Sequence, residues 1–190
     1  MSMQRTILTW GLLSGAVLGG MMVVTIPFAE KVGFERAEIF GYTTMVLAAL
    51  MIFFGIRSYR ENVALGSLTF GKGLLVGAGI ALVAAICYVV VWMAIYYTVF
   101  PNFYDDFATH MLDKAKADGA SAEALAKVSA QAEQIREISG KPLLVAAMTF
   151  AENFPLGLVA ALLSAGLLRR RAHPAPEPRT APAPSNDHLR

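Results

Sequence analysis

One short run of residues, Glu-Asn-Phe-Pro-Leu-Gly at positions 152–157, places chemically capable side chains inside an apolar stretch. The Glu152 carboxyl group can hold a proton or a cation, Asn153 adds an amide, and Pro155 removes one backbone donor from a helix. A carboxylate at mid-membrane costs about 3 kcal/mol or more, so it normally marks a functional site or a specific packing contact. The run is therefore the first candidate site in this chain.

Two functions for Glu152 are compatible with its surroundings in the sequence. No Lys, Arg or His lies well inside an apolar stretch, so no countercharge is available and we expect a neutral carboxyl group. We favour a hydrogen bond that locks Glu152 to a neighbouring helix, with Tyr88 and Thr44 as candidate partners at similar depth. The alternative is transport, in which Glu152 binds a proton or cation next to a helix discontinuity at Pro155.

Small residues recur about one helical turn apart in three of the apolar stretches, and such rows let helix backbones approach closely in lipid. The rows are Gly11, Gly15 and Gly19; Gly73 and Gly77, followed by Ala81 and Ala85; and Asn153, Gly157, Ala161 and Ser164. We expect these rows to pack within one bundle. Homodimerisation through them is the alternative.

Other patterns of chemical interest carry little weight. Residues 66–73 match the phosphate-loop spacing through Lys72, but Gly73 replaces the Ser or Thr that holds magnesium. This segment also joins two apolar stretches, whereas a phosphate loop follows a strand. Cys87 is the single cysteine, so no internal disulfide is possible, and no Cys/His metal spacing or hydrolase pattern occurs. The sequence thus predicts no catalytic residue, no cofactor and no metal, although an enzyme is not excluded.

Composition assigns the chain to the membrane proteins. Its 190 residues are 56% hydrophobic and 16% charged, with a mean hydropathy of +0.53. A helix that crosses a bilayer needs roughly 20 apolar residues. Four stretches meet that length, at residues 6–28, 39–56, 74–100 and 143–168. The first lacks a signal-peptide cleavage pattern and we expect it to be retained, and Glu152 falls about 5 Å outward of the centre of the last span.

Basic residues gather on one side of the predicted spans. The residues on that side are Arg5, Arg57, Arg60, Lys72, Arg169, Arg170 and Arg171. On the other side acidic residues match or outnumber basic ones, so the positive-inside rule places both termini in the cytoplasm. The net charge of +2 then reflects topology, and we expect no nucleic-acid partner.

The third loop, residues 101–141, has the pattern of two helices. Apolar residues recur every fourth position from Phe103 and would continue the third span outward until Asp118–Gly119 supplies a stop. Ser121 is then placed to cap a second helix. The two segments would form a helical hairpin outside the membrane, which packs on itself or recognises a partner.

The last residues differ in kind from the rest of the chain. From position 172 to 190, Pro alternates with Ala, Glu and Arg, a composition that cannot bury a core. We expect a disordered cytoplasmic tail at 172–190 and a membrane domain at 1–171.

Several of these segments together resemble a known family. The residues that carry the likeness are Glu38 to Tyr42, Phe53 to Arg60, Thr69 to Lys72, Glu152 to Gly157, and Ser164 with Ala165 before the Arg run. They are similar to the bacterial membrane family catalogued as domain of unknown function 4199, over roughly Thr6 to Arg171. The resemblance implies a four-span protein of the bacterial inner membrane with its long loop between the third and fourth spans, and it implies no activity.

Taken together, the sequence predicts an all-α, four-span transmembrane helix bundle with a helical hairpin between spans three and four. Its expected role in the lipid bilayer is that of a non-catalytic interaction or accessory protein, with a small transporter or proton- or cation-coupled protein as the alternative. The expected kind of partner is another membrane protein or a second copy of this chain.

Overall fold

The computed structural model describes the backbone of residues 2–32 and 34–170, and the side chains of residues 2–25 and 42–170. Within these residues the chain forms six α-helices and no strand longer than a single bridge. The helices are α1 (Met3–Val32), α2 (Phe34–Asn62), α3 (Phe70–Thr98), α4 (Phe103–Ala117), α5 (Ala122–Ser139) and α6 (Pro142–Leu168). The predicted tail, 172–190, lies outside the described residues.

Four of these helices are long and apolar enough to cross a membrane. The qualifying segments are Met3–Thr25, Tyr42–Asn62, Phe70–Thr98 and Pro142–Leu168, which lie in α1, α2, α3 and α6. Each overlaps a stretch predicted from the sequence, because length and hydropathy are properties that a helix inherits directly from its residues. The prediction of an all-helical chain with four candidate spans is confirmed.

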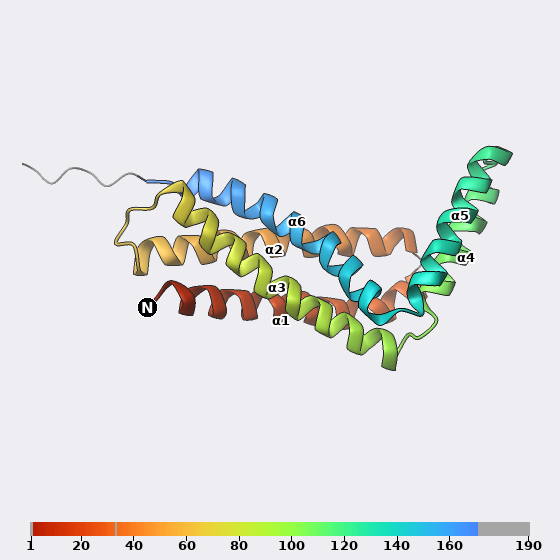
Figure 1. Ribbon diagram of the computed structural model, residues 1–190, viewed down its shortest axis with the longest axis horizontal. Coiled ribbons are helices and arrows are strands. Elements are labelled where there is room, and N and C mark those ends of the chain that lie inside the picture. The colour runs from red at the N-terminus through yellow and green to blue at the C-terminus, as the bar shows by residue number, and fades with distance from the viewer. Residues whose placement is uncertain (1, 33, 171–190) are drawn as a thin grey trace, which may run out of the picture.

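The four long helices lie side by side (Figure 1). α3 packs against α1 and α6, and α2 packs against the same two helices. Residues from α2, α3 and α6 form the main core, including Ile56, Ile80 and Ala161, which are all fully buried. Large apolar side chains also cover the outer surface, for example Val90 at 62% and Leu163 at 64% exposure. An apolar outer surface of this extent suits contact with lipid.

The loop between α3 and α6 forms two helices that project from one end of the long helices (Figure 1). α4 and α5 pack against each other, with Ala108 and Ala132 fully buried between them. α4 ends at Ala117 and Gly119 has a φ of 70°, so the predicted stop near this glycine is confirmed. Ser121 caps α5 as expected, because its hydroxyl oxygen accepts a hydrogen bond from the Ala124 amide at 3.3 Å.

The expectation that α4 would continue the third span is wrong. α3 ends at Thr98 and α4 begins at Phe103, in a different direction (Figure 1). Pro101 explains the break, because it has no amide hydrogen and its ring disfavours helical geometry at the residue before it. The apolar residues that recur every fourth position from Phe103 therefore belong to a separate helix, α4, and do not extend α3.

Aromatic residues hold α4 and α5 to the end of α3. The Trp92 ring lies 4.9 Å from the Phe103 ring between centroids, and its Nε1 donates a hydrogen bond to the Tyr104 hydroxyl at 3.2 Å. The Tyr96 hydroxyl donates to the Ser139 carbonyl at 3.3 Å, which connects α3 to the end of α5. Buried rings with satisfied polar groups fix the position of a neighbouring element, so α4 and α5 are attached to α3 by more than their chain connections.

Candidate functional site

The run at residues 152–157 lies in an unbroken helix. α6 extends from Pro142 to Leu168 with Pro155 inside it, so the helix discontinuity expected at this proline is absent. Pro155 still provides no donor for the Ala151 carbonyl, since its nitrogen carries no hydrogen. The Asn153 side chain is satisfied within its own helix, because its Nδ2 donates to the Thr149 carbonyl at 2.9 Å.

Glu152 is exposed, on the side of α6 away from its seam with α3. Gly157, Ala161 and Ala165 lie at that seam, whereas Glu152 follows the buried residues Val145 and Thr149 along a different side of the helix. No hydrogen bond or ion pair of its side chain occurs among the described residues, although it interacts electrostatically with Tyr88, which is half-buried on α3. Thr44 is also half-buried, on α2. The described contacts thus contain no hydrogen bond that would lock α6 through Glu152.

Gly157 belongs to the packed face of α6, together with the glycines of α3. A Cβ atom added to Gly157 would lie 2.7 Å from the Cβ atom of Ala81, and one added to Gly77 would lie 2.7 Å from that of Ala161. One added to Gly73 would lie 3.2 Å from the Cβ atom of Ala165. These three glycines let the backbones of α3 and α6 approach each other, so both helices use small residues along the same seam.

The glycines of α1 face a different side of α3. Gly11 lies against Val83, Gly15 against Cys87, and Gly19 against Val91, whose nearest side-chain atom would be 3.1 Å from an added Cβ atom. All three glycines are buried by residues of the same chain. The two sets of glycines therefore lie at two different helix–helix contacts within one copy of the protein, α1 with α3 and α3 with α6.

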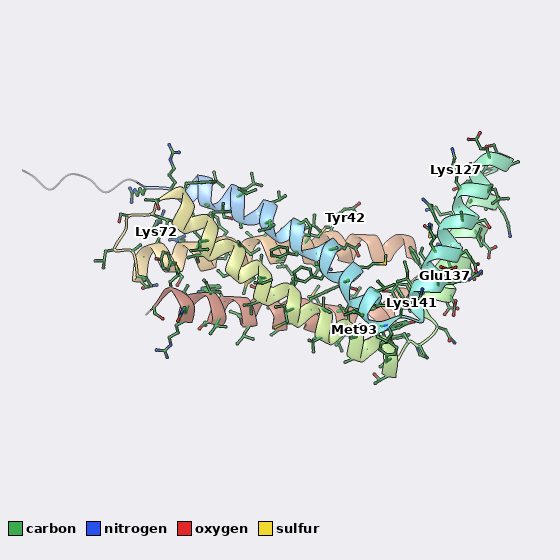
Figure 2. All side chains as sticks on the ribbon, in the orientation of Figure 1. Tyr42, Lys72, Met93, Lys127, Glu137 and Lys141 are labelled. Carbon is green, nitrogen blue, oxygen red and sulfur yellow. The ribbon has the colours of Figure 1, made fainter. Side chains whose placement is uncertain are left out.

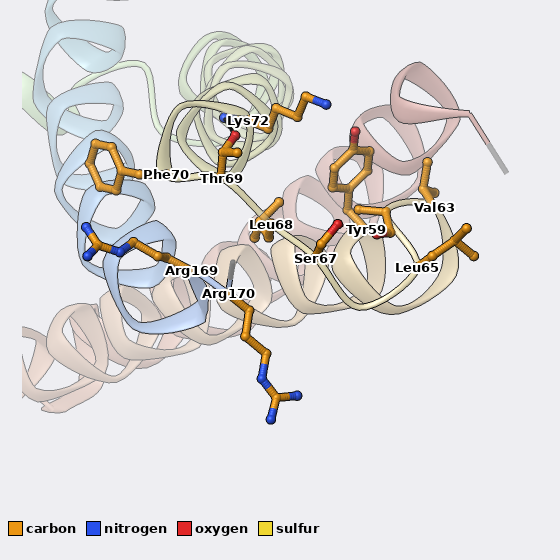
Figure 3. Close-up of a pocket in the computed structure, with 11 residues that line it drawn as sticks. Tyr59, Val63, Leu65, Ser67, Leu68, Thr69, Phe70, Lys72, Arg169 and Arg170 are labelled. Carbon is orange, nitrogen blue, oxygen red and sulfur yellow. Dashed lines mark hydrogen bonds between the residues drawn. The ribbon is translucent and has the colours of Figure 1, made fainter. Parts of the chain in front are cut away.

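A second polar region, which was not singled out from the sequence, lies where α2, α3 and α6 meet at the end opposite α4 and α5. A depression with a volume of about 540 Å³ lies there, and Figure 3 shows the side chains that line it. It is lined by Tyr59, Val63, Ala64, Leu65, Ser67, Leu68, Thr69, Phe70, Lys72, Arg169 and Arg170. The three basic residues come from positions almost one hundred residues apart, so only the tertiary structure unites them; the sequence signal was the gathering of basic residues at predicted span ends.

The backbone around this depression is held by specific contacts. Leu68 and Arg170 exchange two backbone hydrogen bonds, of 2.9 and 3.0 Å, which join the loop before α3 to the end of α6. Arg60 from α2 donates to the Leu168 carbonyl at 3.5 Å. Thr69 caps α3 by accepting a hydrogen bond from the Lys72 amide at 3.4 Å. Lys72 thus follows a helix cap between two long helices, in a context unlike that of a phosphate loop.

Comparison with known proteins identifies the family. Neither the curated proteins nor the solved structures yielded a significant match to the chain. The family model described as Protein of unknown function (DUF4199) matches residues 9–170, which include all four candidate spans in large part, the Glu152 run and the basic depression. The resemblance noted in the sequence is therefore confirmed, and the chain belongs to the DUF4199 family.

Proposed function

We propose that this chain is a four-span protein of the bacterial inner membrane, with a non-catalytic role as an interaction or accessory protein. In this proposal α1, α2, α3 and α6 form the membrane bundle, and α4 and α5 form a hairpin outside it. The outer face of α6 around Glu152 binds a helix of another membrane protein. The observation that carries the proposal is the exposed position of Glu152 on a helix that is long and apolar enough to span a membrane.

Charge supports the orientation of the bundle. Lys72 lies at one end of the long helices, while Lys127, Glu137 and Lys141 lie at the other (Figure 2). The described residues at the Lys72 end include one carboxylate, Glu61, and six cations. The cations are Arg5, Arg57, Arg60, Lys72, Arg169 and Arg170. An excess of basic residues marks the cytoplasmic side, so both termini belong in the cytoplasm and the hairpin belongs outside.

The surroundings of Glu152 support a binding role, because no described residue forms a hydrogen bond or an ion pair with its carboxyl group. In a bilayer, the exposed face of α6 meets either lipid or another helix. A carboxyl group facing lipid carries a free-energy cost of about 3 kcal/mol or more, whereas a polar group on a neighbouring helix lowers this cost. The exposed apolar residues Met148, Leu156 and Val159 lie on the same face at helical spacing and would supply the van der Waals contacts.

The chemistry of the partner follows from what this chain lacks. Among the described residues, no Lys, Arg or His occupies the middle of a candidate span. A second copy would therefore bring only the same carboxyl group and no opposite charge to Glu152. A helix with a basic or amide side chain at matching depth would complement it, and such polar contacts between membrane helices contribute about 1 kcal/mol.

Site-directed photo-cross-linking in intact membranes tests this proposal. A diazirine amino acid replaces Met148 or Val159, next to Glu152, or Leu12 on the exposed side of α1 as a position-matched control. We expect a discrete protein adduct from the two α6 positions and lipid adducts alone from Leu12. Glu152→Leu should lower the adduct yield roughly fivefold, whereas Glu152→Gln should retain most of it, since an amide still forms hydrogen bonds.

The identity of the cross-linked protein decides whether the proposal holds. The cross-linked peptide should come from a different membrane protein and carry a Lys, Arg, His, Asn or Gln within one helical turn of the reacted residue. Replacing that partner residue with Leu should reduce the yield as much as Glu152→Leu does, and the double variant should lose little more. An adduct of two copies of this chain, an adduct unaffected by Glu152→Leu, or lipid adducts alone at all positions would contradict the proposal.

Transport remains the alternative, and it requires a different environment for Glu152. A proton or cation site in a single copy would need Glu152 to face a polar cavity, yet Glu152 faces outward on a continuous helix. A flux assay in reconstituted vesicles separates the two functions. If purified protein alone supports proton or cation flux that Glu152→Gln abolishes, transport replaces the accessory role; if no flux occurs, or Glu152→Gln leaves it unchanged, transport through Glu152 is excluded.

A further inference from the structure

We infer that the depression between α2, α3 and α6 binds the phosphate group of an anionic lipid. The inference rests on the membrane assignment, but it concerns the cytoplasmic end and is independent of the Glu152 face. It joins three features of one place: unpaired cations, a depression large enough for a ligand, and exposed apolar side chains at the end of two candidate spans.

The cations at this site are not neutralised within the described part of the chain. Arg57 and Arg60 both contact Glu61, at 2.9 and 3.2 Å. No ion pair involves Lys72, Arg169 or Arg170 among the described residues, and all three are exposed. An anion in the depression would therefore add favourable charge interactions without breaking an existing pair.

The depression also offers neutral hydrogen-bonding groups. Three of its lining residues, Tyr59, Ser67 and Thr69, carry a hydroxyl group, of which that of Ser67 donates to the Ala64 carbonyl and that of Thr69 accepts from the Lys72 amide. Its volume of about 540 Å³ lies within the range of roughly 300 to 1,000 Å³ that is typical of ligand sites. In Figure 3 the charged ends of Lys72, Arg169 and Arg170 point in different directions, so they do not converge on one point of the depression in this structure. Long flexible side chains of this kind can turn toward a headgroup when one is present.

Position favours a lipid over a soluble anion. Phe70 begins one candidate span and Leu168 ends another, so the depression lies at the level where a span meets the headgroups. Leu65 and Phe70, which line the depression, are exposed by 90% and 39%, and Leu167, two residues before Arg169, is exposed by 78%. Leu65 stands at the tip of a turn with a φ of 49°, an uncommon conformation for leucine, and its side chain has no packing role. Apolar side chains next to cations suit a ligand with both acyl chains and a phosphate.

Native mass spectrometry of the full-length protein in detergent tests the inference. The probes are phosphatidylglycerol and phosphatidylcholine with identical acyl chains, so that only the headgroup charge differs. The triple variant Lys72→Gln, Arg169→Gln, Arg170→Gln removes the three cations of the depression. The matched control, Lys116→Gln, Lys127→Gln, Lys141→Gln, removes three cations from the opposite end of the molecule. Lys72→Gln alone is a milder variant, because this exposed side chain has no described contact.

We expect the parent protein to retain phosphatidylglycerol about tenfold better than phosphatidylcholine, as interfacial cations attract anionic lipids. In the triple variant the remaining preference should be about twofold. Lys72→Gln should lower the preference by a factor of about three, and the control variant should keep the preference of the parent protein. The preference for phosphatidylglycerol should also weaken as the salt concentration rises, because salt screens exposed cations. Circular dichroism of each variant confirms that the helices persist.

Three results would overturn the inference. A parent protein without headgroup preference has no such site. Equal losses in the triple variant and its control indicate general charge attraction instead of a site in the depression. Full displacement of phosphatidylglycerol by millimolar inorganic phosphate or glycerol phosphate identifies a soluble phosphate as the ligand. Glu152→Gln should leave the lipid preference unchanged, so this result is distinct from the outcome for the proposed function.

Discussion

The two faces of α6 have the same helical backbone but opposite environments. On the inner face, Gly157 and Ala161 meet the small residues of α3 at close range. On the outer face, Glu152 lies among the exposed apolar residues Met148, Leu156 and Val159. Close packing on one face thus depends on small side chains, whereas the polar residue with the greatest capacity for chemistry lies where the chain makes few contacts of its own. The difference separates residues that stabilise the fold from residues that are available to a partner.

The largest expected effect is on the inner face. Gly77→Val places a branched side chain where even a Cβ atom would lie 2.7 Å from both Ala161 and Ile56. We expect a loss of about 3 kcal/mol in unfolding free energy, measured by denaturant titration in detergent, because overpacking forces the helices apart. Gly20→Val is the matched control, since nothing lies within 4 Å of a Cβ atom at Gly20. Equal losses in the two variants would show that packing at Gly77 is not special.

A smaller effect of opposite sign is expected at Pro155. This residue is exposed within α6, and Pro155→Ala provides the donor that the Ala151 carbonyl lacks. Alanine also favours helices more than proline does, while the looser unfolded chain offsets part of the gain. We expect the unfolding free energy to rise by about 1 kcal/mol in the same titration. A clear loss of stability would instead indicate that packing at this position depends on the proline.

Asn153 tests a polar contact at the border between the two faces. Asn153→Ala removes the hydrogen bond from the side chain to the Thr149 carbonyl. The carbonyl keeps its position in the helix, so we expect a loss of only about 0.5 kcal/mol. Thermal unfolding followed by circular dichroism measures the change. A loss above about 2 kcal/mol would mean that Asn153 holds a second helix.

The smallest effect on stability is expected on the outer face. Glu152→Leu removes an exposed side chain with no described hydrogen bond, so the unfolding free energy of the isolated protein should change by less than about 0.5 kcal/mol. The same variant should still reduce cross-linking to a partner in membranes. A loss above about 1.5 kcal/mol in the isolated protein would restore the helix-locking contact that we first favoured from the sequence.

Local features were predictable because they depend on neighbouring residues. The helical content and four candidate spans followed from apolar length, and the ends at Gly119 and Ser121 followed from their backbone and capping chemistry. The same reasoning failed at Pro101, where periodicity was given more weight than a missing amide hydrogen. It also predicted a helix discontinuity at Pro155 that α6 does not have, because a helix of this kind tolerates a proline when other contacts support it.

The sequence by itself determined that the chain has four apolar helices, a basic end and one carboxyl group near the middle of the last span. Only the tertiary structure decided which side of each helix packs against its neighbours and which side is exposed. Glu152 faces outward because the small residues on the other side of α6 pack against α3, and a helix cannot present both faces to the same neighbour. The basic depression likewise required the end of α6 to meet the loop before α3, a contact between distant residues that no local pattern encodes.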